Sequence, residues 1–293
     1  MKNTIALLLV FTGIAVAQNV EPVHVPLTDP SRPGRLRAHV INGSIFVRGA
    51  NNTKEVLVEM RPHARSNREG DMEEVPRPPR PPRPPRAGRD TEEEPTPGTA
   101  GMHRLDFGSR GLDVTEQDNV VNVKTTPWGQ NGDLVITVPR NCSLELKTLS
   151  GGRVSVEDVE GEIDVDALNG SITAKNVSGS VLAHSLNGGI TATMDRVDGS
   201  KPMSFSTLNG SIDVTLPDSV KGNVRLKTDN GEVYSDFDVK LDTSTRATTD
   251  SGTRHDGVYR FHMDRTLRGS INGGGPEIQF TSFNGNIYIR KHK

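Results

Sequence analysis

The chain has 293 residues and a formal net charge of -2, and only 32% of its residues are hydrophobic and 4% aromatic. So small a charge excludes a general affinity for nucleic acid or for an anionic membrane surface, and the single cysteine, Cys142, excludes an intrachain disulfide framework. With 30 glycines and 19 prolines beside so few apolar residues, the composition favours thin, repetitive β structure over a thick globular core.

Residues 1–17 have the pattern of a secretory signal peptide. Lys2 precedes a largely apolar run that ends in Ala15-Val16-Ala17, and cleavage is expected between Ala17 and Gln18. No later segment approaches the roughly 20 apolar residues of a membrane-spanning helix. We therefore expect an exported, periplasmic or extracellular protein without a transmembrane segment after the signal peptide. The alternative is an uncleaved N-terminal anchor.

Residues 18–60 are expected to form β-strands that join or cap a larger repeat. Three segments between Leu36 and Met60 alternate apolar and polar residues, and one of them contains the turn of "VINGSIFVRG". A period of two is typical of a strand with one buried side.

Residues 61–101 are expected to be a disordered insertion. Proline lacks a backbone donor and fixes φ, so the run "PRPPRPPRPPR" cannot pair in a sheet and favours polyproline II. Its arginines recur every three residues, which places them along one edge of that helix. They form a candidate interaction site for an aromatic groove or an anionic envelope polymer, and an insertion without a binding role is the alternative. These residues are Arg77, Arg80, Arg83, Arg86 and Arg89.

Residues 102–293 carry a repeat whose turns alternate. Aliphatic residues stand two places after many glycines, as Val154 follows Gly152, Ile172 follows Gly170 and Ile190 follows Gly188. Val-x-Gly and Leu-Asn-Gly turns alternate, so the core spacing is nine residues and the full period is 18. The predicted structural turns at one recurring corner are Asn169-Gly170, Asn187-Gly188 and Asn209-Gly210.

This alternation predicts an all-β fold, specifically a single-chain parallel β-solenoid with rungs of about 18 residues. Val154, Ile172, Ile190 and Ile212 are expected to stack inside it, and the three asparagines to form a hydrogen-bonded ladder. Because Asn-Gly is also the strongest hairpin signal, an antiparallel meander or sandwich is the alternative. Aliphatic residues before the turns are expected to pack under the corners: Leu149, Val159, Leu168, Val177, Leu186, Val197, Leu208 and Val220.

The sequence contains no convincing catalytic, cofactor or metal set. Its eight histidines lack the spacing of a metal site. Glu162, Asp164 and Asp166 alternate in "EIDVD" and share one side of a strand, where they could collect Ca²⁺ or form a solvated acidic face. Their expected rung neighbours, Ser180, Leu182 and His184, add no carboxylate. We assign no catalytic residue, cofactor or metal ligand.

The order of several segments resembles the putative adhesin domain, a bacterial family of adhesin-like β-strand repeats. The segments are "ITVP", repeated "LNGSI", "NGSIDVTLP", "GGGPEIQF" and "FNGNIYIRK", and the resemblance covers roughly Gly111 to Lys293 with a looser match from Leu36 to Met60. It implies a single-chain β-solenoid, commonly exported or membrane-attached, without catalytic residues to transfer.

Together these features predict an exported, non-catalytic protein with an adhesin-like interaction or structural role in the cell envelope. An envelope protein or a glycan is the expected partner, with no nucleic acid. The alternatives are an envelope-stress regulatory scaffold with a protein partner and a polysaccharide-acting β-helix enzyme. The oligomeric state is left open.

Overall fold

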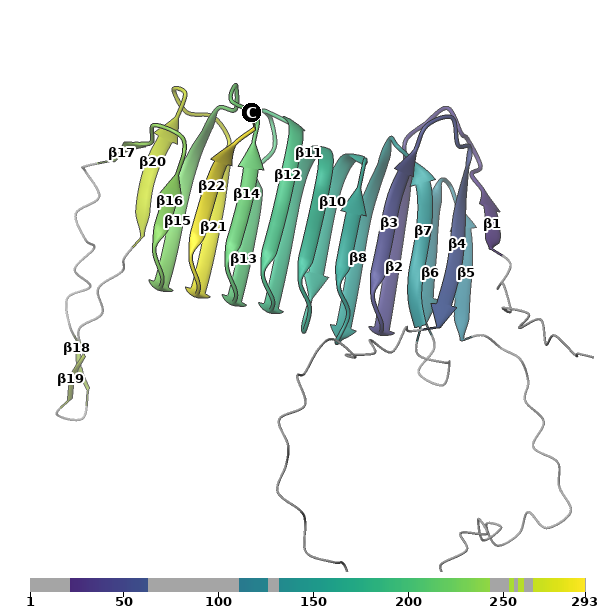
Figure 1. Cartoon of the computed structure of the whole chain (residues 1–293), viewed down its shortest axis with the longest axis horizontal. Coiled ribbons are helices and arrows are strands. Elements are labelled where there is room, and N and C mark those ends of the chain that lie inside the picture. The colour runs from purple at the N-terminus through teal and green to yellow at the C-terminus, as the bar shows by residue number, and fades with distance from the viewer. Residues whose placement is uncertain are drawn as a thin grey trace, which may run out of the picture.

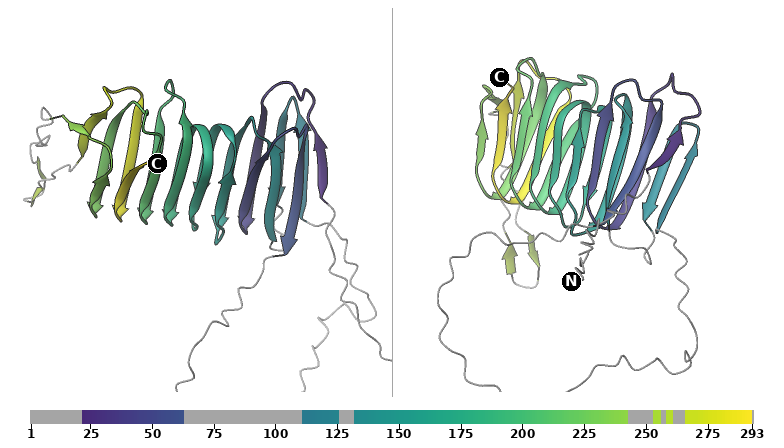
Figure 2. Two further views of the ribbon diagram at one scale, coloured as in Figure 1. Left: turned by 45° about the horizontal axis from the view of Figure 1, so that its top comes forward. Right: turned by 45° about the vertical axis from the view of Figure 1, so that its right-hand side comes forward.

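The computed structural model describes residues 22–62, 111–125, 132–242, 253–255, 258–260 and 266–292. These residues form an all-β structure, as predicted, whose strands stand side by side along one long axis (Figures 1 and 2). None of the described residues lies in a helix, and so this part of the chain offers no helix that could span a bilayer. The signal peptide and nearly all of the proline-rich insertion lie outside the described residues.

The strands pair laterally in two rows, which we name the first face and the second face. The first face runs in the order β5 (Leu112–Gln117), β6 (Val120–Thr125), β2 (Gly34–Asn42), β8 (Cys142–Ser150), β10 (Glu160–Ala167), the second half of β11 (Ile172–Asn187), β13 (Met203–Asn209), β21 (Glu277–Asn284), β15 (Gly222–Asn230), β20 (Leu267–Ile271) and β17 (Lys240–Leu241).

The second face runs in the order β1 (Val23–Pro26), β4 (Glu55–Pro62), β7 (Gly132–Pro139), β3 (Ile45–Ala50), β9 (Val154–Glu157), the first half of β11, β12 (Ile190–Val197), β14 (Ile212–Leu216), β22 (Ile287–Lys291) and β16 (Val233–Ser235). Because β11 continues from one face to the other, the two rows belong to one 20-stranded sheet. A separate antiparallel pair is formed by β18 (Thr253–His255) and β19 (Val258–Arg260).

Pairing along the middle of each face is parallel and follows the predicted register. Ile172 lies opposite both Val154 and Ile190, and Ile190 lies opposite Ile212. The same strands place Ala174 between Val156 and Ala192. Antiparallel pairs among the described strands of the large sheet lie at its two ends, so the sheet is mixed rather than purely parallel.

The order of the strands in space differs from their order in the chain. Strands β2 and β3, purple in Figure 1, lie between teal strands, with β6 and β7 on one side and β8 and β9 on the other. The late strands β21 and β22 similarly lie between β13 and β14 on one side and β15 and β16 on the other. These C-terminal strands are therefore enclosed within the stack.

The inward side chains of both faces form one hydrophobic core, as the alternating pattern predicts. Ile172, Ile190 and Ile212 are each at most 2% exposed, and Phe205 stacks on Phe280 with ring centroids 5.3 Å apart. The inward columns include small residues, Ala174 and Ala192, at successive strands. Burial of these side chains between two facing rows is the main source of stability.

The corners that follow β10, β11, β13, β21 and β15 carry the predicted asparagine ladder. The Nδ2 atom of Asn187 donates to Oδ1 of Asn169 at 2.8 Å, and Asn209 donates to Asn187 at 2.8 Å. The ladder continues beyond these three residues, because Asn284 donates to Asn209 and Asn230 donates to Asn284. Each amide thus bonds to its neighbour across about one strand spacing, as in stacked cross-β ladders.

Glycine is required beside this ladder because consecutive corners approach very closely. A Cβ atom at Gly170 would overlap the carbonyl oxygen of Gly152, and one at Gly188 would overlap that of Gly170. The Asn-Gly pairs therefore mark close-packed corners of stacked parallel strands rather than hairpin turns.

The aliphatic residues before these corners behave in two ways, and half of the prediction is wrong. Val159, Val177 and Val220 are buried at the opposite corner, as expected. Leucines before the Asn-Gly or Ser-Gly corner point outward instead, and Leu149, Leu168 and Leu208 are 45%, 43% and 41% exposed. The inward position beside them is taken by a hydroxyl residue such as Thr207, whose Oγ1 donates to the carbonyl oxygen of Gly188 at 2.8 Å.

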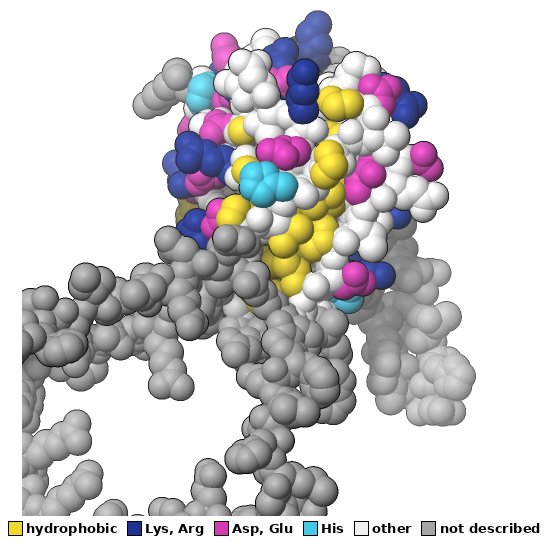
Figure 3. All heavy atoms as spheres, turned by 90° about the vertical axis from the view of Figure 1, so that its right-hand side faces the viewer, with side chains coloured by type: hydrophobic (Ala, Val, Ile, Leu, Met, Phe, Trp, Pro, Cys, Tyr) yellow, Lys and Arg dark blue, Asp and Glu magenta, His cyan; other side chains and the backbone are white. Residues whose placement is uncertain are grey.

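The end of the sheet formed by β1, β4 and β5 exposes apolar side chains. Figure 3 views the end formed by β1, β4 and β5, where apolar side chains gather in a band flanked by charges of both signs. Val23 is 39% exposed there, and Leu112 and Val114 are only partly buried against the core. The antiparallel strands at this end thus close the core only in part.

Candidate binding groove

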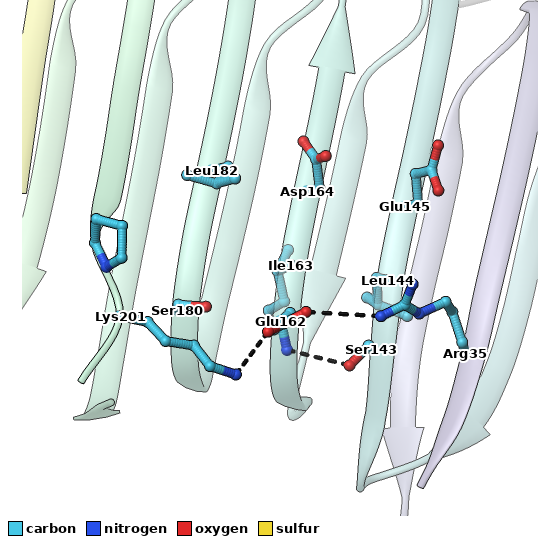
Figure 4. Close-up of a pocket in the computed structure, with 11 residues that line it drawn as sticks. Arg35, Ser143, Leu144, Glu145, Glu162, Ile163, Asp164, Ser180, Leu182 and Lys201 are labelled. Carbon is cyan, nitrogen blue, oxygen red and sulfur yellow. Dashed lines mark hydrogen bonds and ion pairs between the residues drawn. The ribbon is translucent and has the colours of Figure 1, made fainter. Parts of the chain in front are cut away.

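A groove of about 410 Å³ lies on the first face across β2, β8, β10 and β11 (Figure 4). Leu144 and Ile163 belong to the core beneath it, whereas Leu182 and Pro202 add apolar surface on one side. Charged side chains from neighbouring strands complete the lining: Arg35, Glu145, Glu162, Asp164 and Lys201.

The alternation of β10 places the acidic residues in the groove. Ile163 and Val165 point into the core, so Glu162, Asp164 and Asp166 share the outer side, as predicted. Their partners on β11 are the expected Ser180, Leu182 and His184. Sequence reasoning missed the partner on the other side, since Glu145 of β8 lies directly opposite Asp164 and adds a carboxylate.

Glu162 is held by two cations that reach it from opposite sides. Lys201 Nζ lies 2.6 Å from Glu162 Oε1, and Arg35 Nη2 lies 3.7 Å from Oε2 (Figure 4). The hydrogen bond from Lys201, followed by the charge of that ammonium group, lowers the pKa of Glu162. The backbone amide of Glu162 also donates to Ser143 Oγ at 3.4 Å. Glu162 is therefore ionised, and its contacts link β10 to β8 and β2.

Glu145 is also paired with two cations. Arg37 Nε lies 3.1 Å from its Oε2, and Lys147 Nζ lies 3.2 Å from its Oε1. Lys147 also approaches Asp166 at 3.9 Å, and its hydrogen bond to Glu145 raises the pKa of the lysine. These side chains are all at least one third exposed, so each pair stabilises the fold by no more than about 1 kcal/mol.

Asp164 differs from both glutamates because no ion pair within the described residues neutralises it. Partial burial of its carboxyl group raises its pKa, and the negative charge of Asp166 adds to the shift, although the residue as a whole remains exposed. The groove thus offers one carboxyl group that is available to a ligand, with Leu182 opposite it at 44% exposure. A carboxylate acceptor beside an apolar surface suits a neutral, hydroxyl-rich ligand.

The other residues singled out from the sequence lie away from this groove. Asn169, Asn187 and Asn209 form the ladder at the corner, and Gly170, Gly188 and Gly210 stack beside them. Ala17, Gln18 and the five arginines of the proline-rich segment, Arg77 to Arg89, lie outside the described residues. Cys142 is 2% exposed at the start of β8, and burial raises the pKa of its thiol to about 12.

The described residues contain no group of three or more His, Cys, Asp or Glu side chains placed to hold a metal ion. In the acidic "EIDVD" strand, Lys201 and Arg35 occupy Glu162 and Lys147 lies near Asp166. Lys147 extends from β8, Arg35 from β2 and Lys201 from the turn before β13, which is the arrangement of a solvated, charge-balanced face.

Comparisons with known proteins do not assign the chain to a family. No family model and no curated protein sequence matches the chain. Among solved structures, it is similar to a crystal structure of a putative cell adhesion protein from Clostridium sporogenes, at 9% identity over 93% of this chain and 100% of that chain, with a TM-score of 0.31. So low a TM-score carries no argument, and the resemblance to the adhesin-like family stays a sequence-based expectation.

Proposed function

We propose that the protein is an exported, non-catalytic β-solenoid with an adhesin-like role, which binds an extended glycan of the cell envelope along its first face. The parallel register over many consecutive strands supports the solenoid. Export rests on the signal peptide pattern of residues 1–17. N-terminal sequencing of the protein from the envelope fraction should give Gln18 as the first residue.

The observation that carries the proposal is a row of outer side chains that crosses the first face in register. It leads from Asp164 in the groove to Leu182, Ser204 and Gln279 on successive strands. Acceptor, apolar, hydroxyl and amide groups follow one another at intervals of roughly 4.8 Å, the spacing between strands. A polymer lying across the strands would meet all of them without any change in the backbone.

The carboxylates of the groove favour binding over hydrolysis. Glycosidases use two carboxyl groups, one that protonates the leaving group and one that acts as base or nucleophile. Glu162 and Glu145 are each paired with two cations, which leaves Asp164 alone with an available carboxyl group. This supports a non-catalytic site.

The test compares two equally exposed leucines on the mature chain, residues 18–293. Leu182→Glu places a charge beside Asp164 in the groove, whereas Leu149→Glu changes a leucine before the Ser-Gly corner with nearly the same exposure, 45% against 44%. On an array of envelope glycans, Leu182→Glu should weaken binding at least about tenfold and Leu149→Glu less than about twofold.

Equal binding by both variants would remove the groove from the proposal. A protein captured by cross-linking, with an empty glycan array, would favour the scaffold alternative. If neither experiment yields a partner, a purely structural role is left.

A further inference from the structure

The end of the first face carries two arginines that lie directly opposite one another. Arg225 of β15 pairs with Arg268 of the antiparallel strand β20. Directly opposed side chains on one side of a sheet have Cβ atoms about 5 Å apart, and like charges at that separation destabilise the sheet. On the other side of Arg225 lies Gln279, a neutral residue.

Like charges also oppose one another at Glu145 and Asp164, but there Glu145 is paired with Arg37 and Lys147. Several other cations of the described strands reach a carboxylate on a neighbouring strand. Arg37 lies opposite Glu145 and Lys175 opposite Glu157, and each of these pairs forms an ion pair. Arg290, which lies opposite Thr215, forms an ion pair with Asp213 of the same neighbouring strand. Arg225 and Arg268 form no ion pair with any described residue. The chain thus retains an unfavourable contact where a carboxylate at either position would remove it.

The two arginines line a groove of about 590 Å³ that also includes Lys240 of β17. Lys240 lies opposite Ser270, and Ser270 lies opposite Asn223. Ser270 and Asn223 are each two residues from one of the arginines along the strand, so Lys240 lies on the same side of the sheet as both arginines. Two carboxylates, Asp242 and Glu277, line the same groove, and the three cations leave it with an excess of positive charge.

We propose that Arg225 and Arg268 bind the carboxylate groups of an acidic polysaccharide. Guanidinium groups bind oxyanions through paired N–H donors, and two of them one strand apart can share one oxyanion or bind two neighbouring ones. Bound anions would replace the repulsion between the arginines with attraction to both. This inference rests on the proposed function and specifies the class of glycan.

A polymer is favoured over a small anion because the site continues into the row that crosses the first face. Arg225, Gln279, Ser204 and Leu182 follow one another in register from the arginine end, and an acidic polymer would lie on this part of the row, short of the Asp164 carboxyl group. The distance from β15 to β11 is three strand spacings, or roughly 14 Å. Hydroxyl and amide groups along it can bind sugar hydroxyls beside the arginines.

The experiment measures binding of the mature chain to polygalacturonate, with neutral dextran and inorganic phosphate as comparison ligands. Arg225→Gln and Arg268→Gln should each weaken polygalacturonate binding about tenfold or more at low salt. Arg225→Lys should recover only part of the loss, because an ammonium group keeps the charge without the planar fork. Arg37→Gln is the matched control: its arginine already has a carboxylate partner, and binding should change less than about twofold.

A second measurement separates a lost site from a damaged fold. Without ligand, Arg268→Gln removes the like-charge contact, so its Tm should equal or exceed that of the unchanged protein at low salt, and any gain should vanish at high salt. Unchanged polygalacturonate binding by both glutamine variants would overturn the proposal, as would a Tm that falls together with affinity.

Binding of phosphate with no preference for the polymer would overturn the assignment to a glycan. Loss of acidic polymer binding while neutral glycans still bind at the Asp164 groove would support it, and absence of all glycan binding would remove the proposed function as well.

Discussion

The groove and the arginine end of the first face are built from the same kind of strand and handle charge in opposite ways. At the groove, which lies across β2, β8, β10 and β11, Glu162 and Glu145 are each paired with two cations, and these contacts tie strands together. Near the end of the face, Arg225 of β15 lies opposite Arg268 of β20 without a carboxylate partner among the described residues. The sheet therefore does not require charge balance: the ion pairs at the groove stabilise the fold, whereas the arginines are available for a ligand.

The largest effect is expected from disrupting the stack of strands between the groove and the arginine pair. Gly188→Ala should destabilise the protein by about 3 kcal/mol or more, because the new Cβ overlaps the carbonyl oxygen of Gly170. Gly199→Ala is the control: nothing lies within 4 Å of its added Cβ, and the change should stay within about 0.5 kcal/mol.

Urea unfolding followed by circular dichroism measures both variants, and alkylation of Cys142 reports on β8 separately. The thiol is buried, and its pKa of about 12 keeps it unreactive until that strand opens. If the circular dichroism and alkylation transitions coincide, β8 and the rest of the sheet unfold as one unit. An unchanged midpoint for Gly188→Ala would contradict the close packing of the corners.

A smaller effect is expected from the buried hydroxyl residues, such as Thr207, that lie inward of the asparagine ladder. Thr207→Val removes the donor to the carbonyl oxygen of Gly188 at a side chain that is 3% exposed, and should cost about 1 to 2 kcal/mol. Ser206→Ala changes the adjacent outward residue and should have almost no effect. Equal destabilisation by the two substitutions, measured by thermal unfolding, would argue against a role for the buried hydroxyl.

The groove can also be made to resemble the arginine end. Glu162→Gln leaves Arg35 without its carboxylate partner and Lys201 with only the longer contact to Asp198, at 3.8 Å, so the groove should gain affinity for polygalacturonate, about threefold to tenfold at low salt. Glu59→Gln, which frees the single arginine Arg61 on β4, is the control. Titration at low and at 0.5 M salt (about a 3–5 Å screening length) should show the gain and then its loss. No gain at low salt would show that unpaired cations alone are insufficient.

The smallest expected effect concerns Asp164 and depends on pH. Its pKa is raised in the folded protein, so the native state binds more protons than the unfolded state, and stability falls as pH rises from the unfolded value near 3.8 through the raised value. Asp164→Asn should therefore stabilise the protein slightly above that window, on the order of 0.5 kcal/mol or less at so exposed a residue. Below the window both side chains are neutral and the difference should disappear. Tm measured against pH checks this, and a stabilisation that persists in acid would contradict the assigned cause.

The sequence predicts the inward columns and the corner ladder well because both depend on local period. Glycine followed two places later by an aliphatic residue marks the same inward position on each strand, and the 18-residue period aligns Asn169 with Asn187. The exposure of Leu168 was missed because the pattern does not show that a hydroxyl residue occupies the inward position at the corner. Parity along the strand then sends the leucine outward.

Long-range order could not be predicted from these repeats. Many segments have the same glycine-containing turn, so the local sequence does not specify which strand each one pairs with. The position of β2 between β6 and β8 and that of β21 between β13 and β15 could therefore not be predicted. The opposition of Glu145 and Asp164 depends on a spacing of 19 residues instead of 18. Arg225 and Arg268 meet through an antiparallel pairing outside the repeat, and no periodic signal connects them.

The enclosed position of β21 and β22 has a consequence for the order of events during assembly. Strands β15 and β16 precede them in the chain, yet they stack on the outer side of β21 and β22. During synthesis the edge of β13 and β14 therefore stays uncovered until residues 277–291 arrive, and β15 and β16 must be kept from occupying that edge first. Strands β21 and β22 pair with β13 and β14 on one side and with β15 and β16 on the other, so the stack is completed only when this late segment of the chain has been inserted.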